Sequence, residues 1–68
     1  MHFTELIHTI KQRREILQVT QESLADISGV SLRTLKQFES GKGNPTLKTI
    51  QKISETLGLE LTIQVKKL

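Results

Sequence analysis

The residues with the most distinctive chemistry in this 68-residue chain lie in the short stretch SLRTLKQFES. At helical spacing, Leu35 and Phe38 share one apolar face. Arg33, Lys36 and Gln37 point away from that face. Arginine and lysine suit the guanine acceptors of a DNA major groove and glutamine suits adenine, so the second face carries groups that can read base edges. The ordinary alternative is a solvated helix surface, because charged residues mostly lie in water.

Two sets of residues follow as candidates for contact with DNA. Leu32 stands at the start of the stretch, where it can meet a thymine methyl group. The predicted base-reading residues are Leu32, Arg33, Lys36 and Gln37. Helix N-termini and the loops beside them offer N–H groups, hydroxyls and amines to phosphates. The predicted phosphate-contacting residues are Thr20, Gln21, Ser31, Thr34, Ser40, Lys42 and Asn44.

The composition argues against catalysis and against a bound metal or cofactor. The chain has no Cys, no Tyr and a single Asp, and both His residues lie near the N-terminus, so convergent nucleophiles, acids and metal ligands are missing. Single-stranded nucleic acid needs aromatic stacking platforms, and the two Phe residues suit the core better. The net charge of +3 fits a polyanionic partner. Without a membrane-length apolar run or a signal-peptide pattern, a cytoplasmic protein with no membrane partner is expected.

Four helices are expected to position these groups. The hydrophobic spacing predicts them over about residues 4–17, 21–28, 32–40 and 46–57. A hydroxyl-bearing residue that suits an N-cap stands near the start of each: Thr4, Thr20, Ser31 and Thr46. Because only a short turn around Gly29 separates the second helix from the third, the two must cross steeply, as in a helix-turn-helix unit. The apolar residues expected to face inward on the first, second and fourth helices are Phe3, Leu6, Ile7, Ile10, Leu17, Leu24, Ala25, Ile27, Leu47, Ile50, Ile53 and Leu57.

Beyond Gly58 the hydrophobic period changes to strict alternation, which is typical of a half-buried strand over residues 59–66. A lone strand cannot satisfy its own backbone hydrogen bonds. The simplest solution is a homodimer in which two copies pair these strands antiparallel across a two-fold axis. The alternative is a strand that folds back onto its own domain as an unpaired edge. The residues that pairing would bury are Leu59, Leu61, Ile63 and Val65.

Two charged residues fall on the apolar sides of their predicted helices. Arg14 lies on the apolar stripe of the first helix, and Glu39 lies on the core-facing side of the third. A buried charge is costly unless an opposite charge meets it with good hydrogen bonds. We therefore expect Arg14 and Glu39 to form a structural ion pair between these two helices.

From Thr20 to Ile50 the sequence TQESLADISGVSLRTLKQFESGKGNPTLKTI resembles the phage-repressor and Cro-like (XRE) helix-turn-helix family. The TQ start, the LA pair, the GVS turn and the GKGNPTL loop carry the resemblance. It implies a single mostly α, four-helix, lambda-repressor-like domain over residues 1–68 that binds double-stranded DNA. It also implies a phosphate contact for Gln21 and the internal ion pair of Arg14 with Glu39, and its base-reading positions fall on Leu32, Arg33, Lys36 and Gln37. Ser28 departs from the family, which often has an apolar residue before the turn glycine.

The final segment LGLELTIQV is similar to the C-terminal strand of the HipB-like antitoxins, which pairs between the two subunits of a dimer. This similarity implies a transcriptional repressor of the bacterial cytoplasm that binds a pseudo-palindromic operator and autoregulates its own toxin-antitoxin operon. It also implies a HipA-type kinase toxin as a partner. Two alternatives remain open: a stand-alone phage-type repressor, and a protein-interaction module whose main partner is the toxin.

Overall fold

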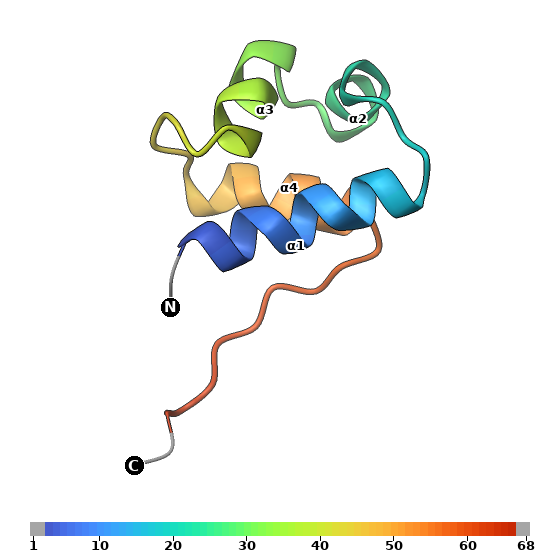
Figure 1. Ribbon diagram of the computed structural model, residues 1–68. Coiled ribbons are helices and arrows are strands. Elements are labelled where there is room, and N and C mark those ends of the chain that lie inside the picture. The colour runs from blue at the N-terminus through green and yellow to red at the C-terminus, as the bar shows by residue number, and fades with distance from the viewer. Residues whose placement is uncertain (1–2, 67–68) are drawn as a thin grey trace.

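The computed structural model describes residues 3–66 and consists of four helices in the predicted order (Figure 1). They are α1 (Phe3–Ile16), α2 (Gln21–Ser28), α3 (Leu32–Glu39) and α4 (Leu47–Thr56). Helices α2 and α3 lie together on one side of α1 and α4 (Figure 1). The mostly α, four-helix fold is therefore confirmed. The outermost residues of the predicted domain, 1–2 and 67–68, lie outside the described part of the chain.

Local hydrogen bonds explain where three of the helices begin. The side chains of Thr20, Ser31 and Thr46 accept a hydrogen bond from the backbone N–H three residues further on, at 3.0, 3.1 and 3.1 Å. Each bond satisfies one of the N–H groups that a helix start leaves without a partner. Thr4, in contrast, lies inside α1, which begins at Phe3, so the predicted cap at Thr4 is wrong.

The end of α1 depends on a residue in the left-handed conformation. Gln18 has a φ of 58°, the one positive value at a non-glycine position among residues 3–66. This geometry turns the chain so that the N–H of Val19 donates to the carbonyl of Arg14 at 3.1 Å. The helix thus ends with a backbone hydrogen bond that usually has glycine at the left-handed position.

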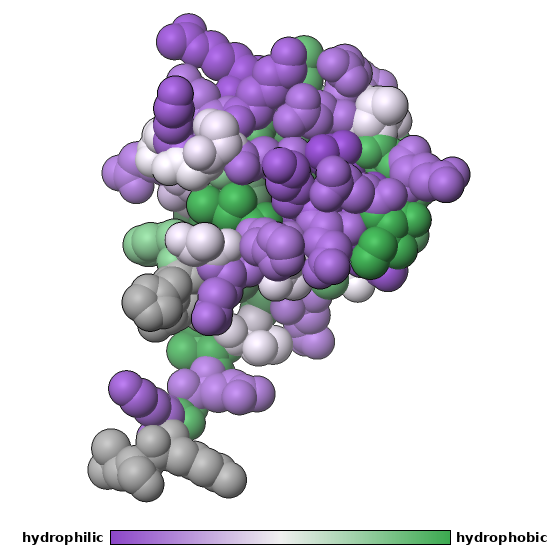
Figure 2. All heavy atoms as spheres, in the orientation of Figure 1, coloured by the Kyte–Doolittle hydropathy of each residue, from purple (hydrophilic) through white to green (hydrophobic). Residues whose placement is uncertain are grey.

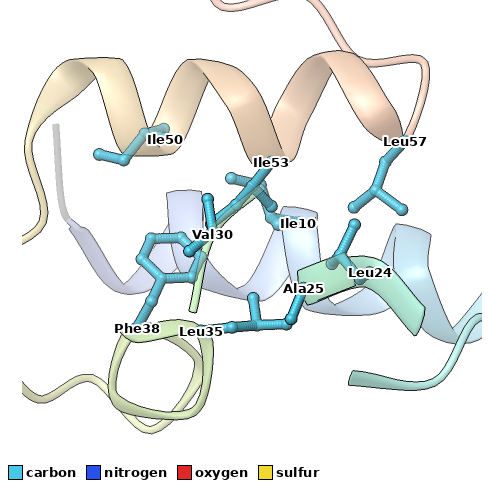
Figure 3. Close-up of a cluster of buried hydrophobic side chains, with 9 residues drawn as sticks. All are labelled: Ile10, Leu24, Ala25, Val30, Leu35, Phe38, Ile50, Ile53 and Leu57. Atoms are coloured by element: carbon cyan, nitrogen blue, oxygen red, sulfur yellow. The ribbon is translucent and has the colours of Figure 1, made fainter. Parts of the chain in front are cut away.

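The core contains apolar side chains from all four helices and from the turn between α2 and α3. Leu24, Leu35 and Ile53 have no solvent-accessible surface, and each such side chain contributes roughly 1.5–3 kcal/mol of transfer free energy. Figure 3 shows the side chains of α3 and α2 facing those of α4 and α1. The buried set is Ile10, Leu24, Ala25, Val30, Leu35, Phe38, Ile50, Ile53 and Leu57.

Four apolar residues predicted to face inward are exposed instead. Phe3 and Leu47, in the first turns of α1 and α4, are 74% and 72% exposed. Ile27 and Leu17, near the ends of α2 and α1, are 68% and 43% exposed. The predicted stripes were too long, because in a domain this small the ends of helices extend beyond the neighbours that would cover them.

The segment after α4 is an extended tail that leaves the helices on the side away from α2 and α3 (Figure 1). Leu59 still packs against the core, and its N–H donates to the carbonyl of Ser54 at 2.8 Å. Ile63 and Val65 are 92% and 97% exposed. No β-strand occurs between residues 3 and 66, so the predicted strand over 59–66 is not formed by the single chain, nor does it fold back. The physical reason is that a strand needs a ladder partner, and residues 3–66 contain no other strand that could supply one.

Within residues 3–66, no helix has the length and apolar character that a membrane crossing requires.

Candidate nucleic-acid interface

The turn between α2 and α3 is fixed by two hydrogen bonds to the end of α2 and by one buried side chain. Gly29 ends α2 with a φ of 76°, and its N–H donates to the carbonyl of Ala25 at 3.1 Å. The hydroxyl of Ser28 accepts from the N–H of Val30 at 3.3 Å. Val30 is itself buried, so this residue anchors the middle of the turn in the core. Ser28, which departs from the family pattern, therefore supplies a turn hydrogen bond where an apolar residue would supply packing.

Helix α3 presents one face to the core and the other to solvent. Leu35 and Phe38 are buried, whereas Arg33, Lys36 and Gln37 are exposed. In Figure 2, hydrophilic side chains cover the end of the molecule formed by α2 and α3. The predicted reading face is thus open to a partner.

Leu32 differs from the other predicted base-reading residues. It is half-buried and packs against the core cluster. The side chain therefore helps to seat the first turn of α3, and its predicted contact with a thymine methyl group would use the part that remains exposed.

Arg14 and Glu39 form a bidentate ion pair between α1 and the end of α3. Arg14 Nε donates to Glu39 Oε2 at 2.7 Å, and Arg14 Nη2 donates to Oε1 at 2.9 Å. Only 12% of the arginine side chain and 3% of the glutamate side chain are exposed. The hydrogen bond with Glu39 raises the pKa of Arg14 above its ordinary value, against the opposing effect of burial. The pair fixes how α3 sits on α1.

The same ion pair holds two neighbouring segments. Arg14 Nη1 donates to the carbonyl of Val19 at 2.8 Å, which ties the turn before α2 to α1. Gln21 Nε2 donates to Glu39 Oε1 at 3.1 Å, and the Gln21 side chain is half-buried. The first residue of α2 is therefore oriented by the last residue of α3. The predicted contact of Gln21 with a phosphate would therefore use the atoms of Gln21 that do not bond Glu39.

Several of the other predicted phosphate contacts are hydroxyls that already serve the helix ends. Thr20 and Ser31 are the caps of α2 and α3, and both are exposed. The Ser31 hydroxyl also donates to Thr34 Oγ1 at 2.8 Å. The hydroxyl of Ser40 donates to the carbonyl of Gln37 at 2.9 Å. Thr20, Ser31 and Ser40 are thus exposed residues whose hydroxyls also hold the backbone around them.

Four of the residues predicted to contact DNA lie close together beside the second half of α3. Thr34, Gln37, Lys42 and Asn44 line one shallow hollow of about 160 Å³, together with Phe38, Gly43 and Pro45. Thr20, Gln21, Ser31 and Ser40 do not line this hollow. An amine, an amide and a hydroxyl at one small concave surface suit a phosphodiester group.

Two structural contacts have no counterpart in the sequence predictions. Arg13 Nε donates to the carbonyl of Leu57 at 3.0 Å and so ties α1 to the end of α4. Gly43 lies next to the side chain of Gln37, which a β-carbon at that position would contact. Neither contact could be predicted from the sequence, because Arg13 looks like an ordinary surface charge and Gly43 like an ordinary loop glycine.

Comparison with known proteins agrees with this geometry. The chain matches the helix-turn-helix family over residues 10–64. It therefore belongs to the helix-turn-helix family, whose members place the second helix of the unit in a DNA groove. The match includes all of α2, the turn and α3.

Three relatives carry the names of transcriptional regulators. The cryptic phage CTXphi transcriptional repressor RstR of Vibrio cholerae is 35% identical over 52 residues, which cover 76% of this chain and 46% of that protein. An uncharacterized helix-turn-helix regulator of Methanocaldococcus jannaschii is 38% identical, covering 76% of this chain and 79% of its own length. An uncharacterized helix-turn-helix regulator of Methanothermobacter thermautotrophicus is 37% identical, covering 75% of this chain and 74% of its own length. The chain thus matches less than half the length of the Vibrio repressor.

Proposed function

We propose that this protein is a sequence-specific, double-stranded DNA-binding transcriptional regulator that acts as a repressor. The observation that carries the proposal is the presentation of α3. Its buried residues and the Gly29 turn hold it rigidly, while Arg33, Lys36 and Gln37 face solvent. A helix that is fixed on one side and polar on the other meets the requirement for reading a major groove.

In this proposal the reading helix discriminates bases through its exposed side chains. Arg33 and Lys36 donate to guanine O6 and N7, and Gln37 pairs with adenine. Each good bidentate contact contributes about 1–3 kcal/mol of discrimination against a wrong base. Leu32 contributes a contact with a thymine methyl group at the first turn.

The surroundings of α3 supply the contacts that hold the protein on the DNA backbone. Lys42 and Asn44 follow α3 and share the hollow with Thr34. Gln21 and the caps Thr20 and Ser31 lie at helix starts, where N–H groups favour anions. These contacts carry no sequence information, but they orient the reading helix.

The working unit in this proposal is a homodimer on a pseudo-palindromic operator. Ile63 and Val65 are almost wholly exposed, and they alternate with polar residues along the tail. Antiparallel pairing with a second copy would give the tail its ladder hydrogen bonds and cover its apolar residues. The two copies of α3 would then lie about 34 Å apart, in successive major grooves.

The biological context divides into three candidates. The pattern of the tail supports a HipB-like antitoxin that represses its own operon in the cytoplasm and binds a HipA-type kinase toxin. The relative named as a phage transcriptional repressor supports a stand-alone repressor. A neighbouring kinase-like gene favours the antitoxin, and DNA binding that is weaker than toxin binding would favour an interaction module.

The test is binding to the DNA upstream of the protein's own gene. The variant Arg33→Ala with Lys36→Ala removes two cations from the reading face, and the variant Lys11→Ala with Lys52→Ala removes two exposed cations from α1 and α4. We expect the reading-face variant to lose discrimination between this DNA and a shuffled duplex, and the control variant to keep it. Equal discrimination by both variants would refute the assignment of the reading face.

A further inference from the structure

The loop that follows α3 turns back along the exposed side of that helix. The N–H of Gly41 donates to the carbonyl of Phe38 at 3.1 Å, and the N–H of Lys42 donates to the carbonyl of Gln37 at 2.8 Å. These bonds bring Gly43 next to Gln37. The loop and the side chain then form one wall of the shallow hollow beside α3.

The Gln37 side chain borders the space that a side chain at Gly43 would enter. A β-carbon added at Gly43 would lie 3.4 Å from Gln37 Oε1, 3.5 Å from its Cβ and 3.9 Å from its Cδ. A methyl group would make ordinary van der Waals contact with Gln37, and further atoms that extend toward α3 would compete with Gln37 for volume. The glutamine therefore lies along the loop, with its amide beside a backbone segment that two hydrogen bonds hold.

This contact matters because glutamine reads a base by geometry. To pair with adenine, the amide must present its oxygen and its nitrogen in the plane of the base. A freely rotating glutamine loses rotamer entropy when it adopts that orientation, whereas a side chain that is already held loses less. The volume available beside Gln37 therefore influences which base it selects and how strongly.

We propose that Gly43 is a specificity-determining positioning residue, which sets the orientation of the Gln37 amide and thereby the base preference at the position that Gln37 reads. The inference rests on the proposed function of α3 as the reading helix. Gly43 contributes by lacking a side chain.

The chain offers a matched control at Gly41. Gly41 and Gly43 have nearly equal φ values, 79° and 81°, so a substitution strains the backbone similarly at both. A β-carbon at Gly41 meets nothing within 4 Å, whereas one at Gly43 meets Gln37. Asparagine tolerates the left-handed conformation better than other side chains. Gly43→Asn and Gly41→Asn therefore differ mainly in whether they displace Gln37.

The experiment is selection from a library of randomised DNA duplexes with wild type, Gly43→Asn, Gly41→Asn and Gln37→Ala. We expect Gly43→Asn and Gln37→Ala to change the preference at the same base pair of each half-site, by about tenfold. Gly41→Asn should keep the wild-type preference, and Gly43→Asn should have no further effect in a Gln37→Ala background. Identical preferences for Gly43→Asn and Gly41→Asn would overturn the proposal.

A second measurement tests the positioning without DNA. Nuclear Overhauser contacts between the Gln37 side-chain amide and the Gly43 α-protons should be present, and the amide signals should shift in Gly43→Asn but not in Gly41→Asn. If these contacts are absent and both variants shift the signals equally, the inference is wrong. If wild type selects no sequence while the contacts are present, the proposed function has failed and the positioning of Gln37 stands by itself.

Discussion

Arg14 and Glu39 are 25 positions apart in sequence and meet in two parallel hydrogen bonds, at 2.7 and 2.9 Å. The pair joins α1 to the last residue of α3, and it also holds Val19 and Gln21. Because the hydrogen bond to Glu39 raises the pKa of Arg14, deprotonation of the guanidinium weakens the pair only in strong alkali. The orientation of α3, and with it the proposed reading face, therefore depends on a largely buried charge pair.

Removing the carboxylate should destabilise the domain strongly. Glu39→Ala leaves the Arg14 guanidinium largely buried without its partner, and we expect a loss of about 3 kcal/mol of unfolding free energy. Glu22→Ala removes an exposed carboxylate of α2 and should cost less than about 0.5 kcal/mol. Thermal unfolding followed by circular dichroism measures both. Small and equal changes in Tm would show that the pair contributes little.

Replacing Gln18, the left-handed residue at the end of α1, should raise the stability of the domain rather than lower it. A non-glycine residue at φ 58° costs roughly 1–2 kcal/mol, and part of this is recovered when glycine replaces it. Gln18→Gly should therefore stabilise the protein by about 0.5 kcal/mol. Gln12→Gly, at an exposed position inside α1, should instead destabilise it by about 1 kcal/mol. Chemical denaturation of the two variants distinguishes them, and a loss of stability in Gln18→Gly would contradict the account.

Salt dependence should report the phosphate contacts. If a dimer neutralises roughly six phosphates, a plot of log affinity against log salt has a slope of about −5. Lys42→Gln, at the hollow beside α3, should weaken binding to all sequences alike and make the slope shallower by about one per lysine that contacts a phosphate. Lys11→Gln on α1 is the control, with the same change of charge. The same slope change in both variants would mean that overall charge, not a contact at Lys42, is responsible.

The tail should decide the oligomeric state. A chain that ends after Glu60 keeps Leu59 and its hydrogen bond to Ser54, so the helical body should remain folded. It lacks Ile63 and Val65, whose exposure motivates the dimer. Sedimentation equilibrium should show a dimer for the intact chain and a monomer for the shortened one, with similar ellipticity at 222 nm per helical residue. A shortened chain that still dimerises would place the interface elsewhere.

Sequence patterns were sufficient where the interactions are local. Hydroxyl caps at Thr20 and Ser31 and the glycine at position 29 fix the ends of α2 and α3 through hydrogen bonds that reach only three or four residues. The faces of α3 followed from helical spacing for the same reason, and Arg14 and Glu39 were conspicuous as charges on apolar stripes. Periodicity failed at Phe3 and Leu47, because it indicates the direction of a side chain and not whether a neighbour covers it.

By itself, then, the sequence determined the four helices, the tight turn and the polar face of α3, since each depends on residues close together in the chain. Only the tertiary structure decided that Gln21 bonds Glu39, that Arg13 reaches the carbonyl of Leu57 and that Gly43 lies against Gln37. These contacts depend on the relative placement of helices and loops, which the packing of the whole core sets to within a fraction of an ångström. The tail is limited in a similar way. Its alternating apolar and polar residues favour a strand, but a strand forms only where a second strand is available to receive its hydrogen bonds.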